Sequence, residues 1–97
     1  MMPLACEILN DTAHVNIDGE LTIYTASDLS AQLLPRLGAT PQMQIDLSQI
    51  TEMDGAGLQL LIMVTREASK AGTALTLTGH SNAVLETLQL SGMGPSV

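Results

Sequence analysis

The sequence predicts an α/β fold, in which a mixed β-sheet packs with helices in the order β-β-α-β-α-β-α. Apolar and polar residues alternate in four short segments, which is typical of strands with one better-covered face. Three other segments repeat apolar residues at helical spacing. Because strands alternate with helices, parallel crossovers are expected. A chain of 97 residues fits a single domain, and we assign 1–97 to it.

The first two strands form an expected antiparallel pair. Cys6–Leu9 reads as a short strand, and His14–Asp18 alternates between apolar and polar residues. Asn10 and Asp11 supply the turn between them. Gly19 breaks the alternation, so the second strand is predicted to end there.

The first helix is expected to begin at Thr25, where Thr25 and Asp28 resemble a capping box. Its apolar face recurs at helical spacing through Ala26, Leu29, Leu33, Leu34 and Leu37. Pro35 should bend or fray the last turn, and Gly38 suits the C-terminal cap.

Met43–Ser48 alternates again and predicts the third strand. Gly57–Ala71 is the longest helical stretch, and because its first half is apolar nearly all round it should be mostly buried. Leu75–Thr78 predicts the last strand, and Ser81 can cap a short final helix. Residues 92–97 are expected to form a loose tail.

Composition excludes several classes of function. The chain carries 3 basic and 10 acidic residues, a formal charge of −7, which argues against nucleic acid as a partner. Cys6 is the only cysteine and cannot form an internal disulfide. No signal peptide is visible, and the longest aliphatic run, Leu60–Val64, is far too short for membrane insertion. We therefore expect a cytoplasmic protein.

All of the net negative charge lies in residues 1–54, which hold one base and eight acids. Two interpretations stay open. The acidity can simply serve solubility, or it can form a docking surface for a basic partner.

The most informative segment runs from Ile45 to Leu61 and reads IDLSQITEMDGAGLQLL. A strand leads through a short loop into the most apolar helix. Asp54 can cap the free N–H groups of that helix, while Gly55 and Gly57 allow a tight turn and a close approach. A helix start of this kind favours a phosphate or carboxylate, but a capped strand-to-helix turn explains the spacing equally.

Two stretches of the sequence resemble the signature of the STAS domain, the fold of bacterial anti-sigma factor antagonists. The first is Asp46-Leu47-Ser48 followed by 53–58, which reads MDGAGL. The second is 19–26, which reads GELTIYTA. The resemblance extends from Val15 to Leu90, and its wording is most similar to small stand-alone STAS proteins associated with chemotaxis-type signalling.

The resemblance implies partner switching. In the family, a Ser or Thr directly after the Asp is phosphorylated by an ATP-binding anti-sigma kinase, and the added charge breaks the complex. Here Gly55 and Ala56 carry no hydroxyl, so phosphorylation at the usual position is chemically impossible. The domain can be permanently competent to bind, be switched on its partner's side, or use a nearby hydroxyl of Ser48, Thr51 or Thr25. Local hydrogen bonding explains Ser48 and Thr51 more simply.

The predicted partner-binding residues lie in these two motifs. They are Met53, Asp54, Gly55, Ala56, Gly57, Leu58, Tyr24 and Thr25. Gly57 and Leu58 are expected to set the helix start. Met53 can serve the interface or the core, and for Tyr24 burial with a bonded hydroxyl competes with partner contact.

No catalytic, metal or cofactor residues are predicted. The chain has neither a P-loop nor a G-x-S-x-G elbow, and His14 and His80 have no ligand-spaced companion. We predict a non-enzymatic interaction module whose partner is an ATP-binding anti-sigma kinase-like or chemotaxis-type protein. The alternative is a structural STAS subunit that supports the ATPase of a lipid transporter. A homodimer formed through an uncovered sheet face or a free edge also stays open.

Overall fold

Four strands and three helices follow the predicted order in the computed structural model, which describes residues 4–92. The strands are β1 (Leu4–Leu9), β2 (Thr12–Leu21), β3 (Gln42–Met53) and β4 (Ala74–Thr78). The helices are α1 (Ala26–Leu33), continued by a 3-10 turn at Leu34–Arg36, α2 (Gly55–Ala71) and α3 (Asn82–Leu90). Most of the expected tail, 93–97, lies outside the described residues.

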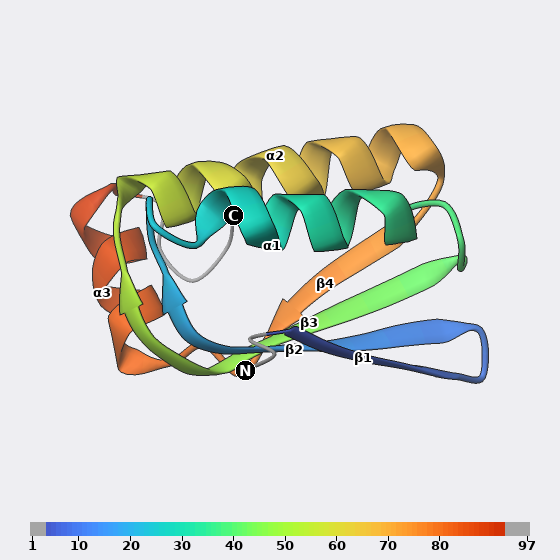
Figure 1. Ribbon diagram of the computed structural model, residues 1–97, viewed down its shortest axis with the longest axis horizontal. Coiled ribbons are helices and arrows are strands. Elements are labelled where there is room, and N and C mark those ends of the chain that lie inside the picture. The colour runs from blue at the N-terminus through green and yellow to red at the C-terminus, as the bar shows by residue number, and fades with distance from the viewer. Residues whose placement is uncertain (1–3, 93–97) are drawn as a thin grey trace.

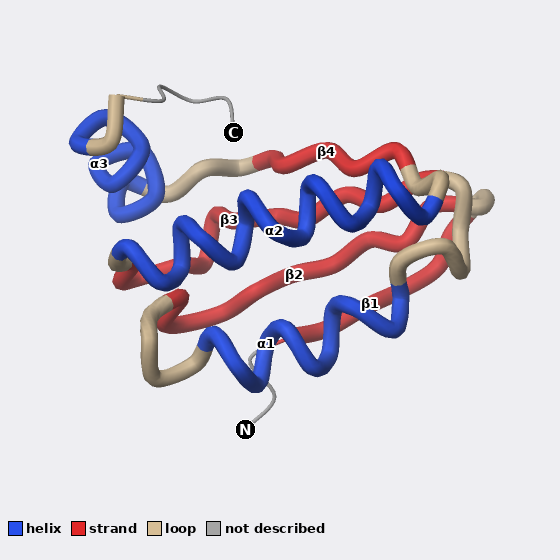
Figure 2. The backbone as a smooth tube through the Cα atoms, turned by 90° about the horizontal axis from the view of Figure 1, so that it is seen from above, coloured by secondary structure: helices blue, strands red, loops and turns tan. Residues whose placement is uncertain are grey.

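The sheet is mixed, with the strand order β1-β2-β3-β4. β1 and β2 are antiparallel, as predicted, while β2–β3 and β3–β4 are parallel. Each parallel connection passes through a helix, and Figures 1 and 2 show α1 and α2 side by side on one face of the sheet. α3 stands at the end of the sheet where α2 begins (Figure 2).

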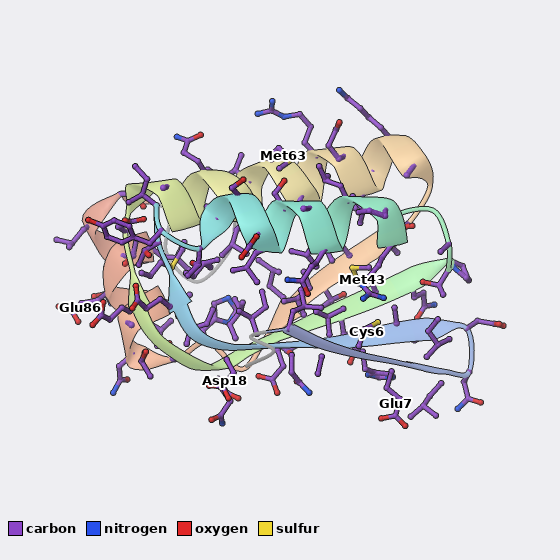
Figure 3. All side chains as sticks on the ribbon, viewed as in Figure 1. Cys6, Glu7, Asp18, Met43, Met63 and Glu86 are labelled. Carbon is purple, nitrogen blue, oxygen red and sulfur yellow. The ribbon has the colours of Figure 1, made fainter. Side chains whose placement is uncertain are left out.

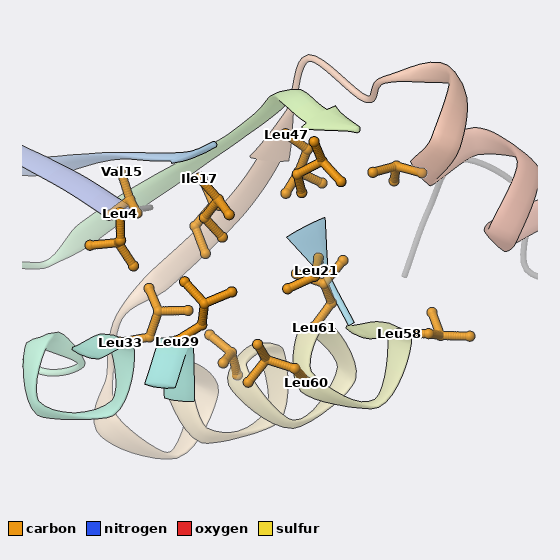
Figure 4. Packing of buried hydrophobic residues seen from close by; sticks show 14 of the residues in the cluster. Leu4, Val15, Ile17, Leu21, Leu29, Leu33, Leu47, Leu58, Leu60 and Leu61 are labelled. Atoms are coloured by element: carbon orange, nitrogen blue, oxygen red, sulfur yellow. The ribbon is translucent and has the colours of Figure 1, made fainter. Parts of the chain in front are cut away.

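The core fills the space between the sheet and these two helices, as Figure 4 shows. Val15, Ile17 and Leu47 point from the strands into this space and are at most 1% exposed. Leu29 and Leu61 meet them from the helices with no exposed surface. The strand alternation therefore predicted the buried face correctly.

The opposite sheet face is open and polar. Asn16 of β2, Asp46 of β3 and Thr78 of β4 lie next to one another across the strands, and a second row runs through His14, Gln44 and Thr76. These residues alternate with the core positions, as a pleated strand requires. This face is mostly polar, but Leu9 of β1, which is 50% exposed and pairs with Thr12, also lies on it.

β2 and β3 are longer than predicted because β-bulges carry their pairing past the points where the alternation breaks. The β2–β3 register shifts between Asn16 and Asp18 and again between Gly19 and Glu20. Gly19 does not end the strand; it has a φ of +98° within it. Bulges bend and twist strands, and Figure 1 shows both strand ends turning up toward the start of α2.

α1 departs from its prediction in two places. Thr25 occupies the N-cap position, but its side chain accepts no capping hydrogen bond from the helix. Leu34 is 38% exposed and does not belong to the buried face. Pro35 acts as predicted, since the α-helix stops before it and a 3-10 turn takes over.

The remaining helix ends lie at or within two residues of their predicted positions. α2 begins at Gly55, two residues before the predicted start, and ends at Ala71 before Gly72. Its apolar first half is mostly buried, although Ile62 and Met63 are half-buried. Ser81 caps α3 by accepting a hydrogen bond of 3.3 Å from the Val84 N–H. Within 4–92, no helix combines the length and the apolar character needed to cross a membrane.

Candidate functional site

Asp54 joins the two signature stretches. It lies between the end of β3 and the first turn of α2, and its Oδ1 accepts a hydrogen bond of 3.0 Å from the Gly57 N–H. Its Oδ2 accepts another, also 3.0 Å long, from the N–H of Ile23 in the loop between β2 and α1. One carboxylate therefore caps α2 and fastens this loop to it.

These two hydrogen bonds set the electrostatics of the carboxylate. The N–H of Ile23, followed by that of Gly57, holds the pKa of Asp54 below its ordinary value. Both donors stabilise the charged form because a carboxylate is a stronger acceptor than a carboxylic acid. Asp54 is therefore charged at neutral pH.

Gly57 lets α2 approach the end of β2. A Cβ at this position would overlap the Leu21 carbonyl oxygen and fall 2.8 Å from the Leu21 carbonyl carbon. The Asp54 N–H donates to the same Leu21 oxygen over 3.4 Å. No side chain fits there, so the close contact between β2 and α2 depends on glycine.

Two threonine hydroxyls order the loop between β2 and α1. The Thr25 hydroxyl donates to the Glu20 carbonyl oxygen over 2.9 Å and accepts from the Thr22 N–H over 3.0 Å. The Thr22 hydroxyl donates to Glu20 Oε1 over 3.1 Å and accepts from the Tyr24 N–H over 3.3 Å. The Thr25 hydroxyl is thus part of the loop framework, which weakens its case as a substitute phosphoacceptor.

This framework presents two large side chains to solvent. Tyr24 is 89% exposed and Ile23 is 67% exposed. The alternative that Tyr24 is buried is therefore wrong. Ile23 lies inside the GELTIYTA stretch but was not predicted as a binding residue. Its spacing continues that of Val15, Ile17 and Leu21, so the alternation gave no signal that it is exposed.

The other predicted residues divide into accessible and buried groups. Gly55 is exposed and Ala56 is half-buried at the start of α2. Gly57 and Leu58 are buried and can act only by shaping the helix start. Met53 is half-buried and packs against the core.

Ser48 and Thr51 lie on β3, before the MDGAGL segment, and both are exposed. The Ser48 N–H donates to Asp46 Oδ1 over 2.8 Å, and this bond, more than that from the Ser48 hydroxyl, holds the pKa of Asp46 below its ordinary value. The expected local bonding is therefore present at Ser48. Neither residue belongs to the first turn of α2, where Gly55 lies.

The charges at this end of the molecule are acidic. Glu20 of β2 and Glu52 of β3 are exposed register partners, and Asp54 follows two residues later. The three bases of the chain lie elsewhere: Arg36 follows α1, and Arg66 and Lys70 lie in the second half of α2. Like charges on paired strands repel one another unless a base comes between them.

A shallow groove of about 340 Å³ continues from this surface between the first halves of α1 and α2. Small side chains on both helices, Ala26, Ser27, Ser30 and Ala56, leave it open, and Met63 lines its far end. Together, exposed Ile23, Tyr24 and Gly55, with Glu20 and Glu52, form what we call the docking surface. Residues 4–92 contain no group of three or more His, Cys, Asp or Glu side chains able to hold a metal ion.

Comparison with known proteins identifies the family. The family model described as "Mlab, STAS domain" matches residues 4–95. The chain belongs to the STAS domain family. The two stretches that resemble the family signature, 19–26 and 53–58, are thus the ones joined by the hydrogen bonds of Asp54.

Anti-sigma factor antagonists are among its relatives. The anti-sigma-B factor antagonist of Bacillus subtilis (strain 168) is 28% identical over 79 residues, which cover 81% of this chain and 72% of the relative. The unphosphorylated anti-sigma factor antagonist SpoIIAA superposes with a TM-score of 0.76 at 22% identity, covering 95% of this chain and 83% of its own. A phosphorylated form of the Bacillus SpoIIAA superposes with a TM-score of 0.72 at 22% identity, covering 95% and 86%.

The same fold also occurs within a longer protein. Our STAS domain superposes on Mglu with a TM-score of 0.69 at 15% identity, and the match covers 75% of this chain but 18% of that one. This likeness concerns the fold alone.

Proposed function

We propose that this STAS domain is a non-enzymatic, anti-sigma factor antagonist-like module that binds a protein partner through the docking surface. The exposure of Ile23 and Tyr24 carries the proposal, because a hydrogen-bonded loop within the second signature stretch holds these two large side chains in solvent. Aromatic side chains on ordered loops are frequent energetic centres of interfaces.

The partner that fits is a protein with an apolar pocket and a basic rim. Tyr24 and Ile23 supply apolar area, while Glu20 and Glu52 supply charges that a basic rim would pair. Arrangements of this kind favour fast and specific association. An ATP-binding anti-sigma kinase-like protein is the first candidate, and a chemotaxis-type signalling protein is the second.

The complex formed by this module is not switched by a phosphate at position 55, because Gly55 has no hydroxyl. We infer that the docking surface is always competent to bind and that control lies with the partner. The same glycine favours a second function, a structural STAS subunit that supports a transporter ATPase, because a permanent subunit needs no switch.

Affinity capture tests the proposal. The tagged chain is used to capture partners from native lysate with and without ATP, alongside a Tyr24→Ala variant. We expect an ATP-binding protein to be retained by the natural chain and lost with Tyr24→Ala. A kinase-type partner supports the signalling function, whereas a transporter ATPase supports the structural one. Equal capture by both chains would refute the docking surface.

A further inference from the structure

A second cavity, of about 470 Å³, lies at the opposite end of α1 from the docking surface. We call it the hairpin crevice. Cys6, Ile8 and Ala13 of the β1–β2 hairpin form one side, and Ala31, Pro35 and Ala39 form the other. Figure 1 shows the distance between the two regions: α1 begins beside the start of α2 and ends above the hairpin. The volume of the hairpin crevice lies within the usual range of small-molecule sites.

Small side chains keep the hairpin crevice open. Ala13 is 2% exposed at its floor, and Ala31 and Ala39 take positions where larger side chains would fill the space. Cys6 is half-buried on the helix-facing side of β1, as Figure 3 shows. Most of the lining is thus apolar and suits an aliphatic chain.

One cation lies among these apolar groups. Arg36 lines the hairpin crevice and is the only base in residues 1–54, while no Asp or Glu lines the cavity. Among residues 4–92 the ion pair present joins Lys70 to Glu67, so Arg36 has no carboxylate partner in that range. Gln32 adds an amide to the same side.

We propose that the hairpin crevice binds a small amphipathic carboxylate, with its aliphatic chain among the alanines and Cys6 and its carboxylate on Arg36. A guanidinium recognises a carboxylate through two parallel hydrogen bonds. The net charge of −7 works against any anion at long range. Binding therefore depends on contact with Arg36 and on the apolar lining, and it is independent of the proposed docking function.

The only cysteine of the chain reports on occupancy. Decanoate is added to the full chain, and the rate at which iodoacetamide alkylates Cys6 is measured together with the melting temperature. We expect saturable slowing of alkylation and a raised melting temperature. Octanoate should bind about tenfold more weakly, because it buries two fewer methylene groups. Decylammonium should not protect Cys6.

Two variants, each with a control, locate the site. Arg36→Gln should weaken decanoate binding about tenfold, whereas Arg66→Gln, with the same charge change on α2, should not. Ala31→Leu fills the hairpin crevice from an exposed helix position and should abolish protection of Cys6, whereas Ser69→Leu on α2 should not. No protection by decanoate, equal binding by the two arginine variants, or unchanged binding by Ala31→Leu would each overturn the proposal.

Discussion

Asp54 serves two segments that are more than thirty residues apart. Its two oxygens accept from Ile23 and Gly57, so the loop before α1 and the first turn of α2 share one anchor. The sequence indicated the cap on α2, because Asp before a glycine-containing helix start is a familiar pattern. The bond to Ile23 was not predictable from spacing, because it depends on how the bulged strands bring the two segments together.

The lowered pKa of Asp54 gives a prediction for acid. A carboxylate with a folded-state pKa below its unfolded value stabilises the fold above the unfolded pKa, and this contribution is lost as the pH falls through the folded pKa. Asp54→Asn should therefore lower the melting temperature by about 5 °C at pH 7. When the melting temperature is measured from pH 7 to pH 3, the values for the natural chain and for Asp54→Asn should converge below about pH 4. A difference in melting temperature that stays the same at all pH values would show that the charge of Asp54 does not stabilise the fold.

Gly57 and Gly55 make a matched pair for substitution by alanine. Gly57→Ala should destabilise the fold by about 1–3 kcal/mol, because its Cβ overlaps the Leu21 carbonyl oxygen. Gly55→Ala should leave stability within about 0.5 kcal/mol, since the added Cβ would meet no atom within 4 Å outside the neighbouring residues and backbone of α2 itself. Urea unfolding of both variants checks this. Similar losses at the two positions would show that the close approach at Gly57 has no energetic weight.

The open space at Gly55 leaves room for a serine, which restores the hydroxyl that this position lacks, or for an aspartate, which mimics the charge of a phosphate. Gly55→Ser and Gly55→Asp should both fold, and the acid should suit the N-terminus of α2. We expect Gly55→Asp to weaken partner binding at least tenfold while Gly55→Ser binds normally, because only the former adds a carboxylate next to Asp54, where repulsion and desolvation in a packed interface oppose binding. Titration calorimetry with the captured partner measures both. Equal affinities would place position 55 outside the interface.

At the scale of elements, the periodicities predicted most of the residues that the strands and helices bury, but not where the elements end. β3 was expected to stop at Ser48, yet it continues to Met53. Beyond Ser48 the alternation changes phase, with Leu47 and Ile50 both buried, because the bulged pairing shifts the register. Leu34 fits the helical face by spacing but points to solvent because Pro35 ends the α-helix before it completes another turn.

The loop after α1 is attached to β4 by a buried hydroxyl. Thr73 is 4% exposed; its hydroxyl accepts from the Gly38 N–H over 2.8 Å and donates to the Thr40 carbonyl oxygen over 3.0 Å. Thr73→Val should cost about 1–3 kcal/mol, because two backbone groups lose their partner. Thr76→Val on the open sheet face is the control and should be nearly neutral. Urea unfolding separates the two, and equal effects would contradict the attachment.

At the scale of the whole molecule, charge and apolar area are distributed unevenly. The acidic pair Glu20 and Glu52 and exposed Ile23 and Tyr24 gather at the end where α2 begins, while Arg36 follows the far end of α1. The sequence indicated acidity in its first half, but only the parallel register places Glu20 beside Glu52. The acidic part of the docking surface therefore depends on the parallel pairing of β2 and β3.

Partner binding should be sensitive to salt. Because exposed charges are screened within about 8 Å at physiological ionic strength, added NaCl should lower the association rate. The double variant Glu20→Gln, Glu52→Gln should bind more slowly and lose most of the salt dependence. Glu7→Gln on β1, at the far side of the sheet from α2, should behave as the natural chain. Stopped-flow association kinetics distinguish these results, and a salt-independent rate would refute a basic rim.

The most direct test of the docking surface compares two exposed isoleucines. Ile23 is 67% exposed beside Asp54, and Ile8 is 60% exposed on the β1–β2 hairpin. We would measure the dissociation constant of the captured partner for Ile23→Ser and Ile8→Ser under identical conditions. The docking surface predicts a loss of at least tenfold for Ile23→Ser and no change for Ile8→Ser. Unchanged affinity for Ile23→Ser, or a greater loss for Ile8→Ser, would contradict it and move the interface to another part of the molecule.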